Sequence, residues 1–296
     1  MTEVPLILGG HSFISQLGND PPASEQEQLR IVEACLDRGI RWIDTTYQPE
    51  RVALGKLLDK LGRRADAAIL AWNFFTDFAP GDPVGGASYY NPEHIGVLLE
   101  QLRTSYVDCL VVVPLDDPEK NRQQEELVLS WQKKGYVRSL GLWVEDVANS
   151  EHYRDRNGFR FGIRPVNVTI QGADRVFAAW KMAGWETIAT SPFFRGWELD
   201  KIVAEACARA LGGAGRLRPM LADLMLRFSL FQPAVDRLIV AMRKEEWVVR
   251  NLESVSKGPL TSKELALLKR LRNPAAKTDR WWHRLLHGLE RRLANH

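Results

Sequence analysis

The sequence predicts an α/β protein, a single (β/α)₈ TIM barrel, and three observations lead to this fold class. The chain has 296 residues, which is within the usual size range of one such barrel. Short apolar runs alternate with longer segments of helical spacing, as in consecutive strand–helix units. Near-continuous apolar runs such as residues 109–113 suit strands that are buried on both faces of a parallel sheet.

Eight apolar runs are strand candidates, and eight parallel strands are the number that closes this kind of barrel. They are residues 6–8, 40–44, 67–72, 107–113, 137–143, 165–170, 186–190 and 237–241. Helical spacing follows most of them, for example in residues 24–38, 51–61, 92–103, 123–134 and 221–231. We expect Ser24 to cap the first helix through its hydroxyl group.

An open doubly wound sheet is the alternative, and the segment after the first strand disfavours it. That fold usually has fewer strands and a glycine-rich phosphate turn of the form GxGxxG at this point. The chain has Gly9-Gly10-His11-Ser12-Phe13 instead. A closed barrel is therefore predicted, and its active site is expected at the end where the strands finish.

Composition bounds the class of protein. The chain is 45% hydrophobic and 26% charged, which fits an ordinary globular protein with a large core. It has no apolar stretch of transmembrane length and no secretory signal pattern, so we expect a cytoplasmic protein without a membrane partner. The three cysteines are widely spaced in apolar segments and are predicted to be reduced, buried thiols (Cys35, Cys109 and Cys207).

The C-terminal segment carries the excess charge. The formal net charge is +3, and residues 277–293 hold five basic and two acidic residues, so the rest of the chain is neutral. A nucleic-acid-binding surface is therefore not indicated. We predict a barrel over residues 1–273 and a basic amphipathic helix over 274–296. That helix would pack on the barrel or on a second subunit, and a membrane-surface helix is the alternative.

Several segments, in order along the chain, resemble those of a known family. They are Gly39-Ile-Arg-Trp-Ile-Asp44-Thr-Thr with Glu50 and Leu54-Gly55, Tyr106 to Pro114, Gly135-Tyr-Val-Arg138-Ser-Leu-Gly141, Ser191-Pro192-Phe-Phe-Arg195-Gly196, and Gln232 to Asn251. Over residues 6–272 the chain resembles the aldo-keto reductases. The resemblance implies a barrel and the reduction of a carbonyl with hydride from NADPH.

The family's catalytic residues match this chain poorly. In the family a Tyr donates a proton, a Lys paired to an Asp tunes its acidity, and a His lies nearby. A phenol with a pKa of about 10 is a poor acid at pH 7 unless a cation stabilises its phenolate. The resemblance places the Asp at Asp44, but Asn73 stands at the Lys position and Val113 at the His position. Pro49 stands at the Tyr position, with Tyr47 nearby in a shortened loop.

Without the Lys, Asp44 would be a buried carboxylate that lacks its usual partner. Burying an unpaired charge is costly, so the carboxylate must find other hydrogen-bond donors or water. Asn73, Tyr47 and His11 are the candidate donors. Alternatively, Asp44 simply bonds backbone groups at the barrel mouth.

The resemblance implies a cofactor site whose nicotinamide end has lost residues and whose adenosine end keeps the family's spacing. It implies that a Ser-Asn pair holds the nicotinamide amide, and Trp143-Val144 replaces that pair here. Gln171 matches a Gln that the family carries on its sixth strand, and Ser191 lies in a matching segment after the seventh. The spacing after the eighth strand is kept. Arg243 and Lys244 would meet the 2′-phosphate of NADP, and Glu246 and Asn251 the adenine. The alternative is a helix start with ordinary surface charges.

Three functions remain open, and each expects a small-molecule ligand in the barrel mouth. The first is a divergent NADP-linked oxidoreductase, with Tyr47 or a water as proton donor. The second is a non-redox lyase or isomerase that performs acid–base chemistry on a sugar-like or planar ligand. Trp72 and Trp143 would stack on such a ligand, or they fill the space left by the missing cofactor ring. The third is a non-catalytic binding or regulatory protein, and self-association through the C-terminal helix is a further expectation. The candidate catalytic residues are His11, Asp44, Tyr47 and Glu145, and no metal site is predicted.

Overall fold

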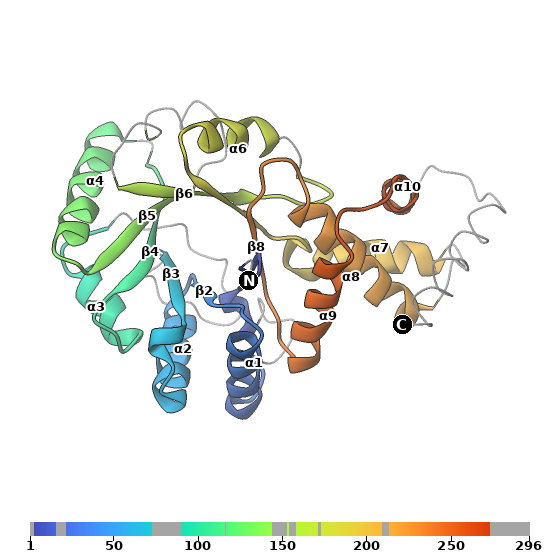
Figure 1. Ribbon diagram of the computed structural model, residues 1–296, viewed down its shortest axis with the longest axis horizontal. Helices are drawn as coiled ribbons and strands as arrows, with labels where there is room; N and C mark the ends of the chain where they lie inside the picture. The colour runs from blue at the N-terminus through green and yellow to red at the C-terminus, as the bar shows by residue number, and fades with distance from the viewer. Residues whose placement is uncertain are drawn as a thin grey trace.

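Eight parallel strands form a closed barrel, and the helices lie outside it (Figure 1). The computed structural model describes residues 3–15, 22–72, 90–115, 117–143, 153, 158–170, 173–208 and 213–272. The strands follow one another around the barrel in chain order, and β1 closes the ring by pairing with β8 as well as β2. The predicted fold class is confirmed.

Seven of the eight strands lie where the sequence predicts them, within one or two residues. The strands are β1 (Leu6–Leu8), β2 (Trp42–Thr45), β3 (Ala68–Trp72), β4 (Val107–Val112), β5 (Val137–Trp143), β6 (Phe159–Pro165), β7 (Glu186–Thr190) and β8 (Arg237–Val240).

The prediction for the sixth strand is wrong, because residues 165–170 follow β6 instead of forming it. In the true strand, Arg160, Gly162 and Arg164 take every second position, so it does not appear as an apolar run. After Pro165 the Asn167 side chain accepts hydrogen bonds from the backbone amides of Thr169 and Ile170, at 2.9 and 2.8 Å. These bonds hold the segment in a turn.

The helices are α1 (Glu25–Asp37), α2 (Gln48–Leu61), α3 (His94–Gln101), α4 (Pro118–Lys133), α6 (Ala173–Met182), α7 (Trp197–Ala208), α8 (Ala214–Leu230), α9 (Glu245–Ser256) and α10 (Ser262–Arg272). Short 3₁₀ turns are η1 (Gly10–Ser12), η2 (Arg64–Asp66) and η3 (Phe194–Gly196). The Ser24 hydroxyl accepts from the Glu27 amide at 3.2 Å, which confirms the predicted cap of α1. No helix in the described ranges is long and apolar enough to cross a membrane. The predicted helix over 274–296 lies outside the described residues.

Two apolar layers hold the barrel together. Every second strand residue points inward, and these side chains fill the barrel (Ile7, Leu70, Trp72, Cys109, Val111, Phe161, Ile163, Ile188 and Ile239). The outward residues pack against the surrounding helices. At Gly162 on β6 the backbone approaches α6 so closely that an added Cβ would overlap the Trp180 ring. The absence of a side chain at Gly162 therefore lets Trp180 bury itself fully against the sheet.

This close approach makes Gly162→Ala a test of the packing. The added methyl group forces Trp180 to move, and we expect the free energy of unfolding to fall by about 1–3 kcal/mol. The matched control is Gly96→Ala in α3, where an added Cβ meets nothing within 4 Å. There we expect a gain of about 0.5–1 kcal/mol, because alanine has less chain entropy to lose than glycine. Denaturant unfolding measures both, and equal stabilities for the two variants would contradict the packing described here.

Candidate functional site

The predicted catalytic residues that the structure describes gather at one end of the barrel. Asp44 lies near the end of β2, and Trp72 is the last residue of β3. His11 lies in η1 directly after β1, and Tyr47 immediately precedes α2. Because the carboxyl ends of all the strands meet at the same end of a barrel, these side chains form a single cluster. Glu145 lies outside the described residues.

Asp44 is buried and receives hydrogen bonds from neutral donors. The indole Nε1 of Trp72 donates to Oδ1 at 2.5 Å, and the Gly10 amide lies 3.5 Å from Oδ2, a long contact. Neither donor was among the three that the sequence suggested, and Asn73 lies outside the described residues. The Trp72 indole thus donates a hydrogen bond to Asp44, the carboxylate that is paired with a lysine in the family that the chain resembles.

Burial raises the pKa of Asp44 to about 7, and the nearby carboxylate of Glu50 acts in the same direction. The hydrogen bond from Trp72, the charge of His11 and the Gly10 amide oppose this rise. The carboxyl group can therefore gain or lose a proton close to neutral pH, which is what a general acid or base requires.

Glu50 lies beside Asp44 and is fully buried. Its Oε2 accepts from the backbone amides of Thr46 at 2.6 Å and Tyr47 at 3.3 Å, which fixes the start of α2. Its Oε1 lies 3.0 Å from Nδ1 of His11. Gly10 passes so near that an added Cβ would overlap this carboxylate. The sequence predicts no catalytic or positioning role for Glu50. The signal for such a role is its place three residues after Tyr47, at the start of a helix.

Tyr47 belongs to the same cluster. Its side chain is buried, and its ring centroid lies 5.7 Å from that of His11. Because Tyr47 immediately precedes α2, the start of that helix determines where its phenol lies. The number of residues between Asp44 and Tyr47 does not by itself predict that position. The structure therefore brings His11, Asp44 and Tyr47 together as the sequence predicted.

An apolar wall stands beside this cluster. Trp72 contacts Trp143 edge-on, with ring centroids 5.3 Å apart, and Val113 packs against the same interior group. Trp72 is buried, whereas Trp143 is half-buried. Indole rings thus occupy the side of the mouth where the family that the chain resembles has polar contacts to the nicotinamide.

The loops after β6 and β7 are joined near Ser191. The fully buried Asn167 donates from Nδ2 to the Ser191 carbonyl at 3.0 Å, and Ser191 has a left-handed φ of 58°. Sequence reasoning missed this role of Asn167. Gln171, which the resemblance matches to a cofactor-binding Gln, lies outside the described residues.

The segment between β8 and α9 lies at the same end of the barrel. The Ser12 hydroxyl accepts from the Met242 amide at 2.8 Å, which ties this segment to the loop after β1. Lys244 precedes the first residue of α9 and is exposed, and Arg243 is half-buried beside it. Basic side chains at a helix start, where the helix dipole is positive, suit a phosphate group. The Glu27 carboxylate accepts from the Glu245 amide at 3.2 Å and so uses one of the amides at this helix start.

Glu246 and Asn251 follow within α9. Glu246 is exposed and lies 3.9 Å from Arg250, whereas Asn251 is half-buried. All four residues predicted for the adenosine end therefore lie within or directly before one helix. Among the described residues, no group of three or more His, Cys, Asp or Glu side chains is placed to hold a metal ion.

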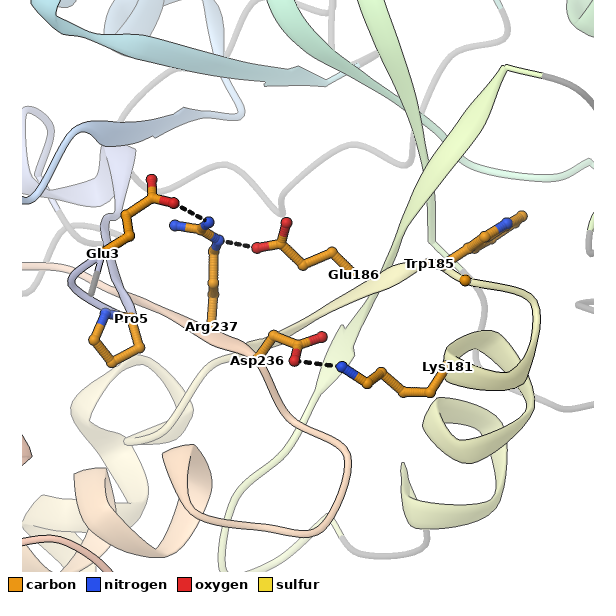
Figure 2. Close-up of a pocket in the computed structure, with 8 residues that line it drawn as sticks. Glu3, Pro5, Lys181, Trp185, Glu186, Asp236 and Arg237 are labelled. Atoms are coloured by element: carbon orange, nitrogen blue, oxygen red, sulfur yellow. Dashed lines mark hydrogen bonds and ion pairs between the residues drawn. The ribbon is translucent and has the colours of Figure 1, made fainter. Parts of the chain in front are cut away.

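A cavity of about 400 Å³ lies at the opposite end of the barrel, where the strands begin (Figure 2). Its charged side chains face one another: Arg237 pairs with Glu3 at 2.6 Å and with Glu186, and Lys181 pairs with Asp236 at 2.5 Å. In barrels of this kind the chemistry occurs at the other end. We therefore interpret these ion pairs as structural contacts and place the functional site around Asp44.

Comparison with known proteins supports the barrel fold and identifies its family. A model of the aldo/keto reductase family matches residues 5–273. The chain belongs to the aldo-keto reductase family. No curated protein matches it in sequence.

Solved structures of the family share its fold at low sequence identity. An aldo-keto reductase from Bacillus halodurans in its holo form is 18% identical, with a TM-score of 0.66 over 93% of this chain and 94% of that one. An aldo-keto reductase from Klebsiella pneumoniae, crystallised with NADPH, is 19% identical, with a TM-score of 0.65 over 93% and 94%. A glycerol dehydrogenase from Gluconobacter oxydans is 15% identical, with a TM-score of 0.67 over 94% and 95%.

The raised pKa of Asp44 predicts how stability depends on pH. The carboxyl group ionises near 3.8 in an ordinary environment and near 7 in the folded chain. Its contribution to stability is therefore complete below about pH 4 and is lost as the pH rises to 7, by up to about 1.4 kcal/mol per pH unit. Asp44→Asn removes this loss.

Denaturant unfolding between pH 4 and 8 measures the effect. We expect the wild-type free energy of unfolding to fall more steeply with pH than that of the variant. Asp59→Asn is the control, because Asp59 is exposed and pairs with the exposed Arg103. Parallel curves for the wild type and Asp44→Asn would show that Asp44 ionises normally in the folded chain.

Proposed function

We propose that this chain is a divergent NADP-linked oxidoreductase whose proton donor differs from the family's tyrosine–lysine pair. The observation that carries the proposal is the position of Arg243 and Lys244 at the start of α9, at the same end of the barrel as the Asp44 cluster. One end of the mouth thus offers cations for a phosphate, and the other offers groups that exchange protons. The proposal includes a small-molecule substrate and a cytoplasmic location.

The residues present fit the adenosine end of NADP better than the nicotinamide end. Lys244 and Arg243 would bind the 2′-phosphate by charge-assisted hydrogen bonds, with Glu246 and Asn251 beside the adenine. Ser191 would lie nearer the nicotinamide, which supplies hydride when it is bound. Trp143 replaces a polar contact there, so we expect weaker binding than a complete site would give.

The apolar wall narrows the class of substrate. Trp72 and Trp143 offer aromatic edges and faces instead of hydrogen-bonding groups, which favours a carbonyl compound with a planar or apolar body. Tyr47 lacks the lysine that would stabilise its phenolate, so we expect slow reduction of simple aldehydes.

A non-redox enzyme is the second candidate, because one observation favours it. A carboxyl group with a pKa near 7 can act as a general acid or base without any nucleotide. Elimination or isomerisation of a sugar-like or planar ligand in the same mouth would use Asp44 with His11 or Tyr47.

Titration with NADPH, followed by quenching of tryptophan fluorescence, tests the first candidate. We expect saturable binding that Lys244→Glu weakens by about tenfold, because a charge-assisted contact is lost and a repulsion is gained. NADH, which lacks the 2′-phosphate, should bind equally to the wild type and the variant. Lys133→Glu at the end of α4 is the matched control, since it is exposed and remote from α9.

The outcomes separate the candidates. Saturable NADPH binding with slow turnover of 4-nitrobenzaldehyde is the expected result. If NADPH does not bind, the oxidoreductase proposal is contradicted, and loss of ligand conversion in Asp44→Asn would favour the non-redox enzyme. A chain that binds ligands but converts none would be a binding or regulatory protein.

A further inference from the structure

We propose that His11 is the catalytic acid of the barrel mouth and that Glu50 positions it. This inference rests on the proposed function, because it names the group that protonates the substrate in the place of a tyrosine–lysine pair. It assigns a role to Glu50, a residue outside the predicted catalytic set.

Glu50 can orient His11 because its own position is fixed. The carboxylate is fully buried, and two backbone amides at the start of α2 bind its Oε2. Its Oε1 is enclosed and makes no well-aligned hydrogen bond. Within the described ranges, His11 is the basic side chain that lies within ion-pair distance of this oxygen, with Nδ1 at 3.0 Å. A buried carboxylate that needs a partner thus lies against one nitrogen of the imidazole.

The ring has a second nitrogen on the edge away from Glu50. His11 follows β1 directly, at the catalytic end of the barrel, and 24% of its side-chain surface is exposed whereas that of Glu50 is 0% exposed. The proposal places Nε2 toward a substrate in the mouth. A carboxylate on Nδ1 determines which nitrogen carries the proton in the neutral ring and stabilises the charged ring.

Charged groups from two neighbouring elements surround His11. Two carboxylates are close to it, Asp44 from β2 and Glu50 from α2. Arg51 of α2 opposes them because its guanidinium interacts with Glu50, and Tyr47 contributes a neutral phenol ring at 5.7 Å. Glu50 thus supplies the negative charge with which an imidazolium at this position would pair.

In the proposed reaction, His11 protonates the carbonyl oxygen that receives the electron pair. NADPH, when bound, would supply hydride to the carbonyl carbon of the substrate, and the former π-electron pair would then reside on the carbonyl oxygen. His11 gives its Nε2 proton to that oxygen, which yields an alcohol and a neutral imidazole. Bulk solvent would then return a proton to the imidazole, and the two electrons of the reduction would come from NADPH, which would leave as NADP⁺.

Nuclear magnetic resonance tests the positioning role without any substrate. The ¹⁵N shifts of the His11 ring, assigned by comparison with His11→Ala, show which nitrogen carries the proton in the neutral form. We expect the proton on Nδ1 in the wild type and a mixture of both forms in Glu50→Gln. The surface variant Glu119→Gln, on α4, is the matched control and should leave the His11 signals unchanged. A wild-type ring protonated on Nε2 would overturn the proposal.

Kinetics with NADPH and 4-nitrobenzaldehyde test the catalytic role. We expect His11→Ala to lower kcat by on the order of 10²–10⁴-fold with KM near the wild-type value. We expect Glu50→Gln to move the alkaline limb of the pH profile to lower pH, and Glu50→Asp to restore part of the rate. Turnover in His11→Ala within twofold of wild type would overturn the proposal.

Two controls keep these outcomes separate from folding and from cofactor binding. Glu50 also binds backbone amides, so thermal unfolding accompanies each measurement, and His11→Ala leaves those amide bonds intact. If NADPH does not bind to the wild type, the proposed function fails, and the ¹⁵N shifts alone decide whether Glu50 positions His11. If NADPH binds and His11→Ala remains active, the proposed function stands and the role of His11 fails.

Discussion

The burial of the Asp44 carboxyl group is the constraint on which the barrel mouth depends. A carboxylate inside a barrel is costly unless donors surround it or a proton neutralises it. The chain uses both means: Trp72 donates its indole N–H, and burial raises the pKa of Asp44 to about 7. The donation requires Trp72 to point inward at the end of β3, where it also contacts Trp143. Gly10 must pass close by without a side chain, and that places His11 against Glu50.

Sequence periodicity was enough to predict the barrel because most of its strands are apolar on both faces. The interior needs one face of each strand, and the helix layer needs the other. β6 escaped prediction because Arg160 and Arg164 lie on its outer face, and one of them is exposed. The apolar residues that follow it form a turn around the Asn167 side chain. Only the folded chain shows that the amides of Thr169 and Ile170 donate to the Asn167 side chain and not to a neighbouring strand.

The site was predictable in its members but not in their partners. His11, Asp44 and Tyr47 were expected together because they follow neighbouring strands of one barrel. From the sequence, Trp72 was expected to provide an apolar surface. The residues next to it in the chain do not indicate that its N–H donates a hydrogen bond to Asp44. The role of Glu50 depends on where α2 begins, and a helix start is uncertain by a residue or two from sequence alone. Glu145 and Gln171 belong to segments outside the described residues.

The pairing of the shortest strand, β1, with the last strand, β8, has a consequence for how the molecule is made. Leu6 pairs with Leu238, and the Ser12 hydroxyl accepts from the Met242 amide, so the ring can close only after β8 has been synthesised. Contacts between residues so distant in sequence form slowly, because closing a long loop costs chain entropy. Once β8 has formed, Arg237 pairs with Glu3 and Glu186 where these strands begin, and so helps to hold β1 in place. During synthesis, β1 therefore emerges long before its partner and spends that time without the neighbour that completes its hydrogen bonding.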